Sequence, residues 1–346
     1  MTLGAHGHGR FREVFFRLAA SEVLRGATRP VLVCRWPCSA PVFWFGPEYW
    51  HAAGPKTPSV AGSRRPMADT RKETKVFETI LVPVDGSEEG WQALEQAFEV
   101  ARREGTGAVL HGLYVVDNTL VTTPYEFLMA AAVEAEAALV QQGREVMAEF
   151  ARRAAAARVR AVTETVEGDV GRVICERAGL TDLVVLGRHG SGGAAARLLF
   201  GSAFEVVVRY SPRPVLVAVG PLRPVHRVLL AYDGSDRAKD ALALVARAAR
   251  SRGAAVTVLS VTEPDRIGQD TLAAAADYLR EHGVEPALLM LPEEHPAAAI
   301  LRIAEQRQVD LIALGGYGHG RFLGMLFGHT VDEVLRETTR PVLVCR

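Results

Sequence analysis

The chain repeats its own sequence, and this repetition limits its fold more than any other feature does. Three signatures of one stretch return in the same order in a later stretch. They are ILVPVDGS at 80–87 and VLLAYDGS at 228–235, DLVVLGRHG at 182–190 and DLIALGGYG at 310–318, and RPVLV at 213–217 and 340–344. The second stretch is about 20 residues shorter in its middle. We therefore expect two domains of one fold in tandem, copy one at 77–220 and copy two at 224–346.

A partial third copy stands at the N-terminus. Residues 4–35 align with 315–346 without a gap and are identical at 19 of 32 positions. We interpret 1–35 as the end of another such domain, a helix and a last strand, which is too short to bury a core of its own. Residues 36–76 are rich in proline and tryptophan and end in basic residues, which indicates a linker or a partner-binding strip. The alternative is that translation naturally starts at Met67, so that residues 1–66 are not normally synthesised.

Within each copy, short β-branched apolar runs alternate with longer stretches of helical periodicity. This alternation predicts βαβ units and a parallel sheet. We expect an α/β fold of two doubly wound domains, each with a five-stranded parallel sheet in the order 3-2-1-4-5 flanked by helices. The expected strands are 79–84, 108–116, 159–166, 183–187 and 215–219 in copy one, and 225–231, 255–261, 285–291, 311–314 and 342–344 in copy two. The copy-two runs are apolar throughout, which predicts burial on both faces.

The first helix of copy one has a clear amphipathic pattern. Its apolar residues recur at the period of 3.6 that places side chains on one face of a helix. They are Trp91, Leu94, Phe98 and Ala101. Ser87 precedes two glutamates, and we therefore expect it to cap the N-terminus of this helix.

The repeated loops lie where this class of fold binds its ligands. Ligands bind beyond the carboxyl ends of the strands where the winding reverses, a point that the first and fourth strands flank. Asp85 and Asp233 follow the two first strands, and Gly-x-x-Gly loops at 187–190 and 315–318 follow the two fourth strands. Glycines let the backbone approach a phosphate, and the helix that opens at 201–202 offers N–H groups to an anion. The alternative is that the glycines make tight turns and that Asp-Gly-Ser is a helix cap.

Composition and missing motifs narrow the classes of function. Lys plus Arg and Asp plus Glu both number 40, a balance that disfavours nucleic acid as a partner. The sequence has no Gly-x4-Gly-Lys-Ser/Thr, and no Gly-x-Gly-x2-Gly follows the first strand, which disfavours P-loop and dinucleotide enzymes. Cys34 and Cys38 lack a second ligand pair for zinc, and unpaired thiols fit the cytoplasm. We find no signal peptide and no apolar run of about 18 residues, so we expect no membrane association.

Both copies resemble the universal stress protein family, in its ATP-binding branch. That branch has Gly-x2-Gly-x9-Gly-Ser/Thr after the fourth strand and an Asp at the end of the first. The resemblance covers 77–220 and 224–346, and weakly 4–35. It implies that nucleotide is bound in copy one by Pro83, Asp85, Val115, Leu186, Gly187, Gly190, Gly201, Ser202 and Ala203, and in copy two by Asp233, Val261, Gly315, Gly318, Gly328 and Thr330.

Each copy departs from the family motif at one point. In copy one, ten residues rather than nine separate Gly190 from Gly201. In copy two, His329 replaces the Ser or Thr, and Thr330 stands next to it. The N-terminal fragment has Arg17 where the later glycine belongs and lacks the first-strand Asp, so we expect it to bind no nucleotide.

The resemblance implies a cytoplasmic, non-catalytic stress-response module that binds ATP, ADP or AMP, with Mg²⁺ accompanying ATP. It also implies self-association through the last strands, between the two copies and in a homodimer. Two alternatives stay open: a ligand-free dimerising interaction module, and a weak ATPase or adenylyl-transfer enzyme. Against the enzyme, His189 has no carboxylate or nucleophile beside it in the motif. The first strand also ends in neither His-x-Gly-His nor Ser-Gly-Gly-x-Asp-Ser, the motifs of adenylyl-transfer relatives of this fold.

Overall fold

The computed structural model describes residues 76–103, 107–117, 129–188, 203–220, 224–292, 295–317 and 328–346. The expected partial third copy at 1–35 and the linker up to residue 75 lie outside the described residues. Within the described part of the chain, no helix combines the length and the apolar composition that a membrane crossing requires.

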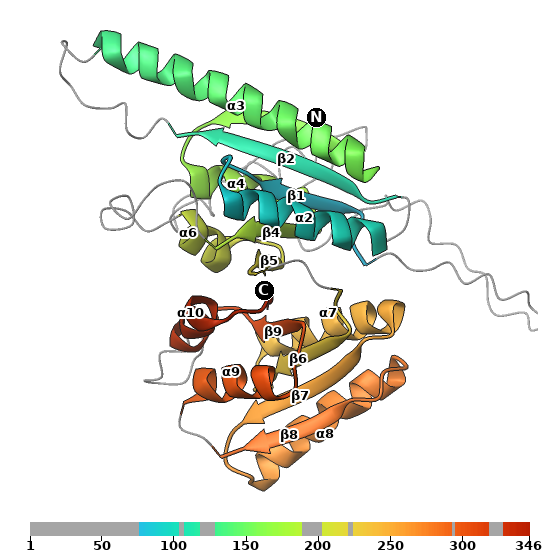
Figure 1. The fold of residues 1–346 in the computed structure, drawn as a ribbon. Coiled ribbons are helices and arrows are strands. Elements are labelled where there is room, and N and C mark those ends of the chain that lie inside the picture. Colours follow the sequence, from blue (N-terminus) through green and yellow to red (C-terminus); the bar gives the residue numbers. More distant parts are fainter. Residues whose placement is uncertain are drawn as a thin grey trace, which may run out of the picture. The chain divides into compact units, whose positions relative to one another are not determined.

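Strands and helices alternate along both copies, as the sequence pattern predicts (Figure 1). The elements of copy one are β1 (Thr79–Pro83), α2 (Glu88–Arg103), β2 (Val109–Val116), α3 (Met129–Ala157), β3 (Arg160–Glu167), α4 (Val170–Ala178), β4 (Leu183–Gly187), α6 (Ala203–Tyr210) and β5 (Val215–Ala218). Those of copy two are β6 (Arg227–Ala231), α7 (Asp236–Arg252), β7 (Ala255–Val261), α8 (Arg266–Glu281), β8 (Ala287–Leu291), α9 (Pro296–Gln306), β9 (Leu311–Gly315), α10 (Gly328–Glu337) and β10 (Val342–Cys345).

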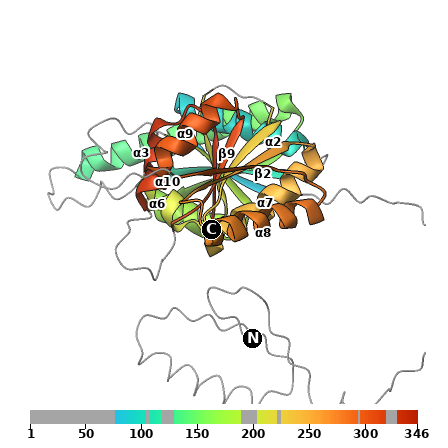
Figure 2. The same ribbon diagram turned by 90° about the horizontal axis from the view of Figure 1, so that it is seen from below.

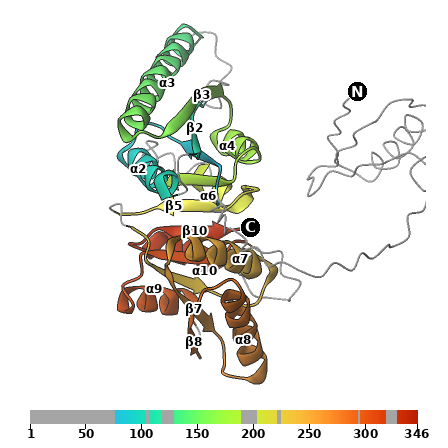
Figure 3. The same ribbon diagram turned by 90° about the vertical axis from the view of Figure 1, so that its right-hand side faces the viewer.

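The strands of both copies form one sheet in the order β3-β2-β1-β4-β5-β10-β9-β6-β7-β8. Each half has the order 3-2-1-4-5, which confirms the prediction. Neighbouring strands within a copy are parallel. β5 and β10 instead pair antiparallel, with Leu216 opposite Leu343. Figure 3 shows these two strands side by side, so the predicted association of the two copies through their last strands is confirmed.

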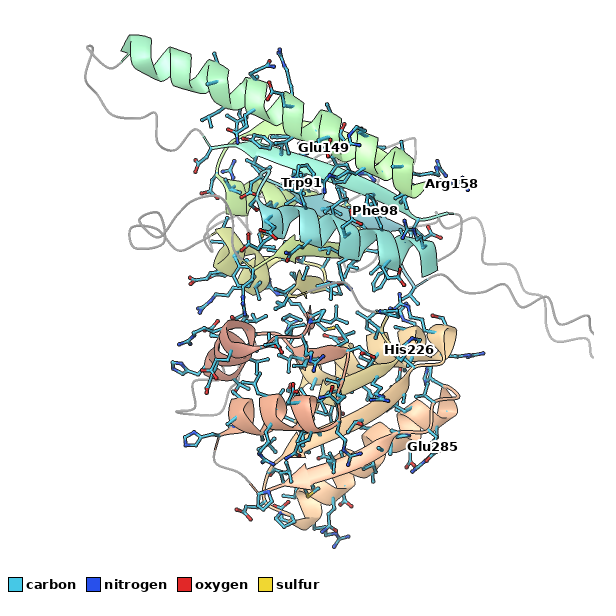
Figure 4. All side chains as sticks on the ribbon, viewed as in Figure 1. Trp91, Phe98, Glu149, Arg158, His226 and Glu285 are labelled. Atoms are coloured by element: carbon cyan, nitrogen blue, oxygen red, sulfur yellow. The ribbon has the colours of Figure 1, made fainter. Side chains whose placement is uncertain are left out.

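Helices cover both faces of the sheet, and each face has its own core. On one face pack α2, α3, α7 and α8, with Leu94, Phe98 and Ala101 of α2 buried as predicted. Trp91 is partly buried against this core, and the Arg153 guanidinium lies 4.4 Å from the centre of its ring (Figure 4). On the other face pack α4, α6, α9 and α10. Figure 2 shows α6 and α10 across the sheet from α2 and α7.

The observed strands match the expected ranges within two residues, but burial differs at the edges of the sheet. β5 and β10 at the centre are buried along their whole length. β8 was expected to be buried on both faces, and this is wrong, because Leu288 has 39% of its surface accessible. The physical reason is position: among the strands that the structure describes, β8 lies at the edge of the sheet and has a neighbour on one side only.

Candidate functional site

The Asp-Gly-Ser signature of copy one forms the turn between β1 and α2. Asp85 Oδ1 accepts hydrogen bonds from the backbone N–H of Ser87 at 3.0 Å and from its hydroxyl at 2.5 Å. The Ser87 hydroxyl in turn accepts from the Gly90 N–H at 3.1 Å, so Ser87 caps α2 as predicted. Gly86 has a φ of +84°, a backbone conformation in which a side chain would be strained.

Copy two repeats this turn between β6 and α7. Asp233 Oδ1 accepts from the Ser235 N–H at 3.0 Å, and the Ser235 hydroxyl accepts from the Ala238 N–H at 3.2 Å. The capping role that the sequence left as an alternative is therefore real in both copies. The two aspartates differ in burial, since Asp85 is partly buried and Asp233 is exposed.

The glycines that end the fourth strands have a packing role. A Cβ at Gly187 would lie 2.7 Å from the Glu89 carbonyl oxygen, and one at Gly315 would lie 2.7 Å from the Ala238 nitrogen. Both distances are shorter than any van der Waals contact to a carbon atom. Glycine is therefore required for the fourth strand to approach the first helix, whether or not a ligand binds.

The fold brings six of the predicted copy-one residues to one edge of the sheet. These six are Pro83, Asp85, Val115, Leu186, Gly187 and Ala203. β1 lies between β2 and β4, so the carboxyl ends of all three strands meet at this edge. The connection from β4 leads to α6, which begins at Ala203. The other three predicted residues, Gly190, Gly201 and Ser202, lie outside the described residues, as does His189.

The equivalent edge forms in copy two. β6 lies between β7 and β9, so the carboxyl ends of these strands also meet. The predicted residues found there are Asp233, Val261, Gly315, Gly328 and Thr330, whereas Gly318 lies outside the described residues. In the first turn of α10, His329 is exposed and Thr330 is partly buried.

Two tyrosines that the sequence motifs miss lie beside these turns. Burial raises the pKa of Tyr114 in β2, and the charge of Asp85 raises it further. Burial likewise raises the pKa of Tyr232, which precedes Asp233; Lys239 opposes this rise and Asp233 adds to it. Both phenols therefore stay protonated at neutral pH and can donate a hydrogen bond. Neither tyrosine recurs in the other copy, so the internal repeat carries no signal for them.

Two residues of the strand-four loops contact the other copy, and sequence reasoning missed both contacts. Arg188, directly after Gly187, donates hydrogen bonds to the end of α10. Tyr317, two residues after Gly315, packs against Arg209 of α6. These contacts depend on the pairing of β5 with β10, which places segments of the two copies together that no local motif relates.

Known structures and sequences of one family match this chain. A crystal structure of a universal stress protein from Archaeoglobus fulgidus matches with a TM-score of 0.64 at 24% identity, covering 79% of this chain and 97% of that chain. A universal stress protein of Mycolicibacterium smegmatis is 27% identical over 289 residues, 77% of this chain and 96% of the relative. One of Synechocystis is 31% identical over 169 residues, 48% of this chain, and the match spans 58% of that relative's length.

A model of the universal stress protein family matches residues 77–218 and 224–346. These two segments correspond to copy one and copy two of the internal repeat, and together they make up more than half of the chain. The chain therefore belongs to the universal stress protein family, with two of the family's domains in tandem.

Proposed function

We propose that copy one binds an adenine nucleotide, ATP, ADP or AMP, and serves as a stress-response module without catalytic activity. The observation that carries the proposal is the edge where β1 and β4 end side by side. At this point α2 packs on one face of the sheet and α6 on the other, so the winding direction reverses. Open α/β sheets bind ligands at such reversals.

The residues at this edge suit the parts of a nucleotide. Pro83 and Val115 are partly buried apolar side chains against which a base can pack. Asp85 offers a carboxylate to the ribose hydroxyls. The first N–H groups of α6, from Ala203 onward, have no acceptor within the helix and attract phosphates. With ATP as the ligand, Mg²⁺ would accompany the phosphates.

Copy two has the same edge, but two differences favour copy one as the stronger site. Asp233 is exposed whereas Asp85 is partly buried, so water competes more for hydrogen bonds to Asp233. His329 also stands at the position of Ser202, where the family motif has a hydroxyl.

A negative charge at the start of α6 tests the proposal without harming the fold. Ala203→Glu places a carboxylate at a helix N-terminus, where it stabilises the helix but repels phosphates. Thr330→Glu is the equivalent change in α10. Ile267→Glu is the matched control, because Ile267 is 75% accessible and lies in the first turn of α8, in the other copy.

We expect calorimetric titration of the full chain with ATP to show affinity about tenfold lower for Ala203→Glu, equivalent to about 1.4 kcal/mol, and unchanged for Ile267→Glu. Melting temperatures close to the wild type would establish that the variants fold. Equal affinity in Ala203→Glu would refute a site in copy one, and loss in Thr330→Glu alone would assign it to copy two. We also expect no ATP turnover above the rate in buffer, and repeated turnover would instead indicate an ATPase.

A ligand-free interaction module is the second candidate, but the pairing of β5 with β10 counts against the last strands as its docking surface. Each of these strands has a neighbour on both sides, so neither offers a free edge to a second chain. The expected homodimer through the last strands would have to break this pair. If the wild type binds no ATP, light scattering should then show whether the chain associates by another surface.

A further inference from the structure

The last helix of copy two, α10, is capped at its C-terminal end by an arginine of copy one. Arg188 Nη1 donates to the carbonyl oxygens of Arg336 and Thr338 at 3.1 Å and of Leu335 at 3.2 Å. The last carbonyl groups of a helix have no N–H donor within the helix, and they carry the negative end of its dipole. A guanidinium satisfies both needs at once, so Arg188 fixes this end of α10.

A second arginine of copy one holds the other half of α10. Arg209 Nη2, in the last turn of α6, lies 2.8 Å from Asp332 Oδ2 in α10. The Tyr317 hydroxyl donates to the other oxygen of Asp332, and the Arg209 guanidinium lies 4.8 Å from the centre of the Tyr317 ring. Burial, and then the hydrogen bond to Asp332, raises the pKa of Tyr317, so its hydroxyl stays a donor. Arg209 thus contacts both α10 and the strand-four loop of copy two.

The antiparallel pairing of β5 with β10 explains how one copy contacts both halves of α10. The strands of copy two run opposite to those of copy one, so the carboxyl edge of one copy adjoins the amino edge of the other. Arg188 follows β4 at the carboxyl edge of copy one, beside the end of α10. Arg209 lies in the last turn of α6 at the amino edge of copy one, which adjoins the carboxyl edge of copy two, where α10 begins. The copy-two residue equivalent to Arg188 is Gly316, which has no side chain. Copy two returns a longer hydrogen bond, from Arg346 Nη1 to the Ser211 carbonyl oxygen after α6 at 3.3 Å, against the three that Arg188 makes.

The charge of Asp332 makes this arrangement relevant to ligand binding. Asp332 lies four residues after the start of α10, the end at which copy two would hold phosphates. A carboxylate there opposes a bound anion unless a neighbouring cation neutralises it. Arg209 supplies that cation from copy one.

We propose that Arg188 and Arg209 of copy one are positioning residues for nucleotide binding in copy two, because they hold the C-terminal end and the first half of α10 and neutralise Asp332. This inference rests on the proposed function for its ligand. It implies an asymmetric dependence. Nucleotide binding in copy two depends on contacts from copy one more than nucleotide binding in copy one depends on contacts from copy two.

The test separates the two copies within the full chain. Ala203→Glu weakens nucleotide binding in copy one, so that the measured affinity mainly reports copy two, whereas Thr330→Glu does the reverse. We expect Arg209→Gln to lower ATP affinity about fivefold in the Ala203→Glu background, the upper range for a partly exposed ion pair. We expect Arg188→Gln, which removes charge-assisted hydrogen bonds to the end of α10, to have an effect of similar size. In the Thr330→Glu background, each change should lower the affinity less than about twofold. Arg209→Lys, which keeps the charge, should restore most of the loss.

Arg177→Gln is the matched control, because Arg177 pairs with Glu164 at 2.7 Å at similar exposure but within copy one. Hydrogen exchange of the amides at 331–337 gives a readout without ligand, and should quicken in Arg188→Gln and Arg209→Gln but not in Arg177→Gln. The inference would be overturned by equal losses of affinity in both backgrounds or by unchanged hydrogen exchange. It would also be overturned if Ala203→Glu bound no ATP while the wild type did. Absence of ATP binding in the wild type would refute the proposed function instead, and exchange alone would then decide whether copy one holds α10.

Discussion

Asp182 ties the start of β1 to the start of β4 through a single carboxylate oxygen. Its Oδ2 accepts from the N–H groups of Glu78 and Thr79 and from the Thr79 hydroxyl, each at 2.9 Å. Asp310 makes the equivalent backbone bonds in copy two, at 2.8 and 2.9 Å. The repeated aspartate of the fourth-strand signature therefore serves strand pairing, at the edge opposite the candidate ligand.

We expect Asp182→Ala to lower the free energy of unfolding by about 1–3 kcal/mol, because backbone donors lose a charged acceptor. Burial alone would raise the pKa of Asp182, but its hydrogen bonds outweigh burial and the net pKa is lowered. The stabilisation is thus complete above about pH 4, the unfolded-state value, and is lost as the pH falls through the lower folded-state value. Urea unfolding of both proteins at pH 7 and pH 3 checks this, and a difference that does not shrink at pH 3 would contradict it.

Single residues show how far the sequence predicts the candidate site. Asp85 and Gly187 can be placed at one edge of the sheet from the repeat and from the strand order alone. Their local contacts could not be predicted, because the close approach of Gly187 to Glu89 depends on how a helix packs on a strand. The roles of Arg188 and Arg209 lie further from prediction, since they follow from the pairing of the two copies.

At the scale of elements, the two edge strands of the sheet are protected differently. β3 carries Arg160, Glu164 and Glu167, and charges of this kind discourage pairing with another chain. β8 has the sequence ALLML and carries no charge. The uncharged edge is the one at which we expect partly unfolded chains to associate.

We expect Leu288→Lys in β8 to slow the association of the full chain on heating, because a charge on an edge strand opposes pairing. Leu288 is partly exposed, so the free energy of unfolding should change by less than about 0.5 kcal/mol. Val162→Lys in the already charged β3 is the control and should have little effect. Light scattering during a temperature ramp measures both, and equal protection by the two changes would argue against a special role of β8.

The fold is more predictable at this scale than the site. The five strands of each copy and their order follow from the alternation of apolar runs and helical stretches, because βαβ units have one handedness and short connections. The exposure of β8 was not predictable from its apolar sequence, since burial depends on which strands lie beside it. A run of apolar residues does not reveal whether its strand is central or at an edge.

At the scale of the whole molecule, the seam between β5 and β10 joins the two copies into one core. Leu216 and Leu343 lie opposite each other there and are 5% and 6% accessible. The buried cluster to which both belong also contains residues of α2 and α7, one helix from each copy. The two copies therefore share buried apolar surface.

We expect Leu343→Ala to cost about 2–5 kcal/mol, because it leaves a cavity in this shared core. Since the copies share that core, calorimetry should show one transition at a lower temperature. Leu272→Ala in α8, equally buried but away from the seam, should lower the same single transition. A second transition that stays at the wild-type temperature would show that copy one unfolds independently.

The antiparallel seam has one more consequence. Every strand of copy one ends at one long edge of the sheet and every strand of copy two ends at the opposite edge. On the proposed function, nucleotides bound to the two copies would face away from each other and would not compete for space. The duplication therefore places the two candidate sites on opposite edges of one sheet, and does not enlarge a single pocket.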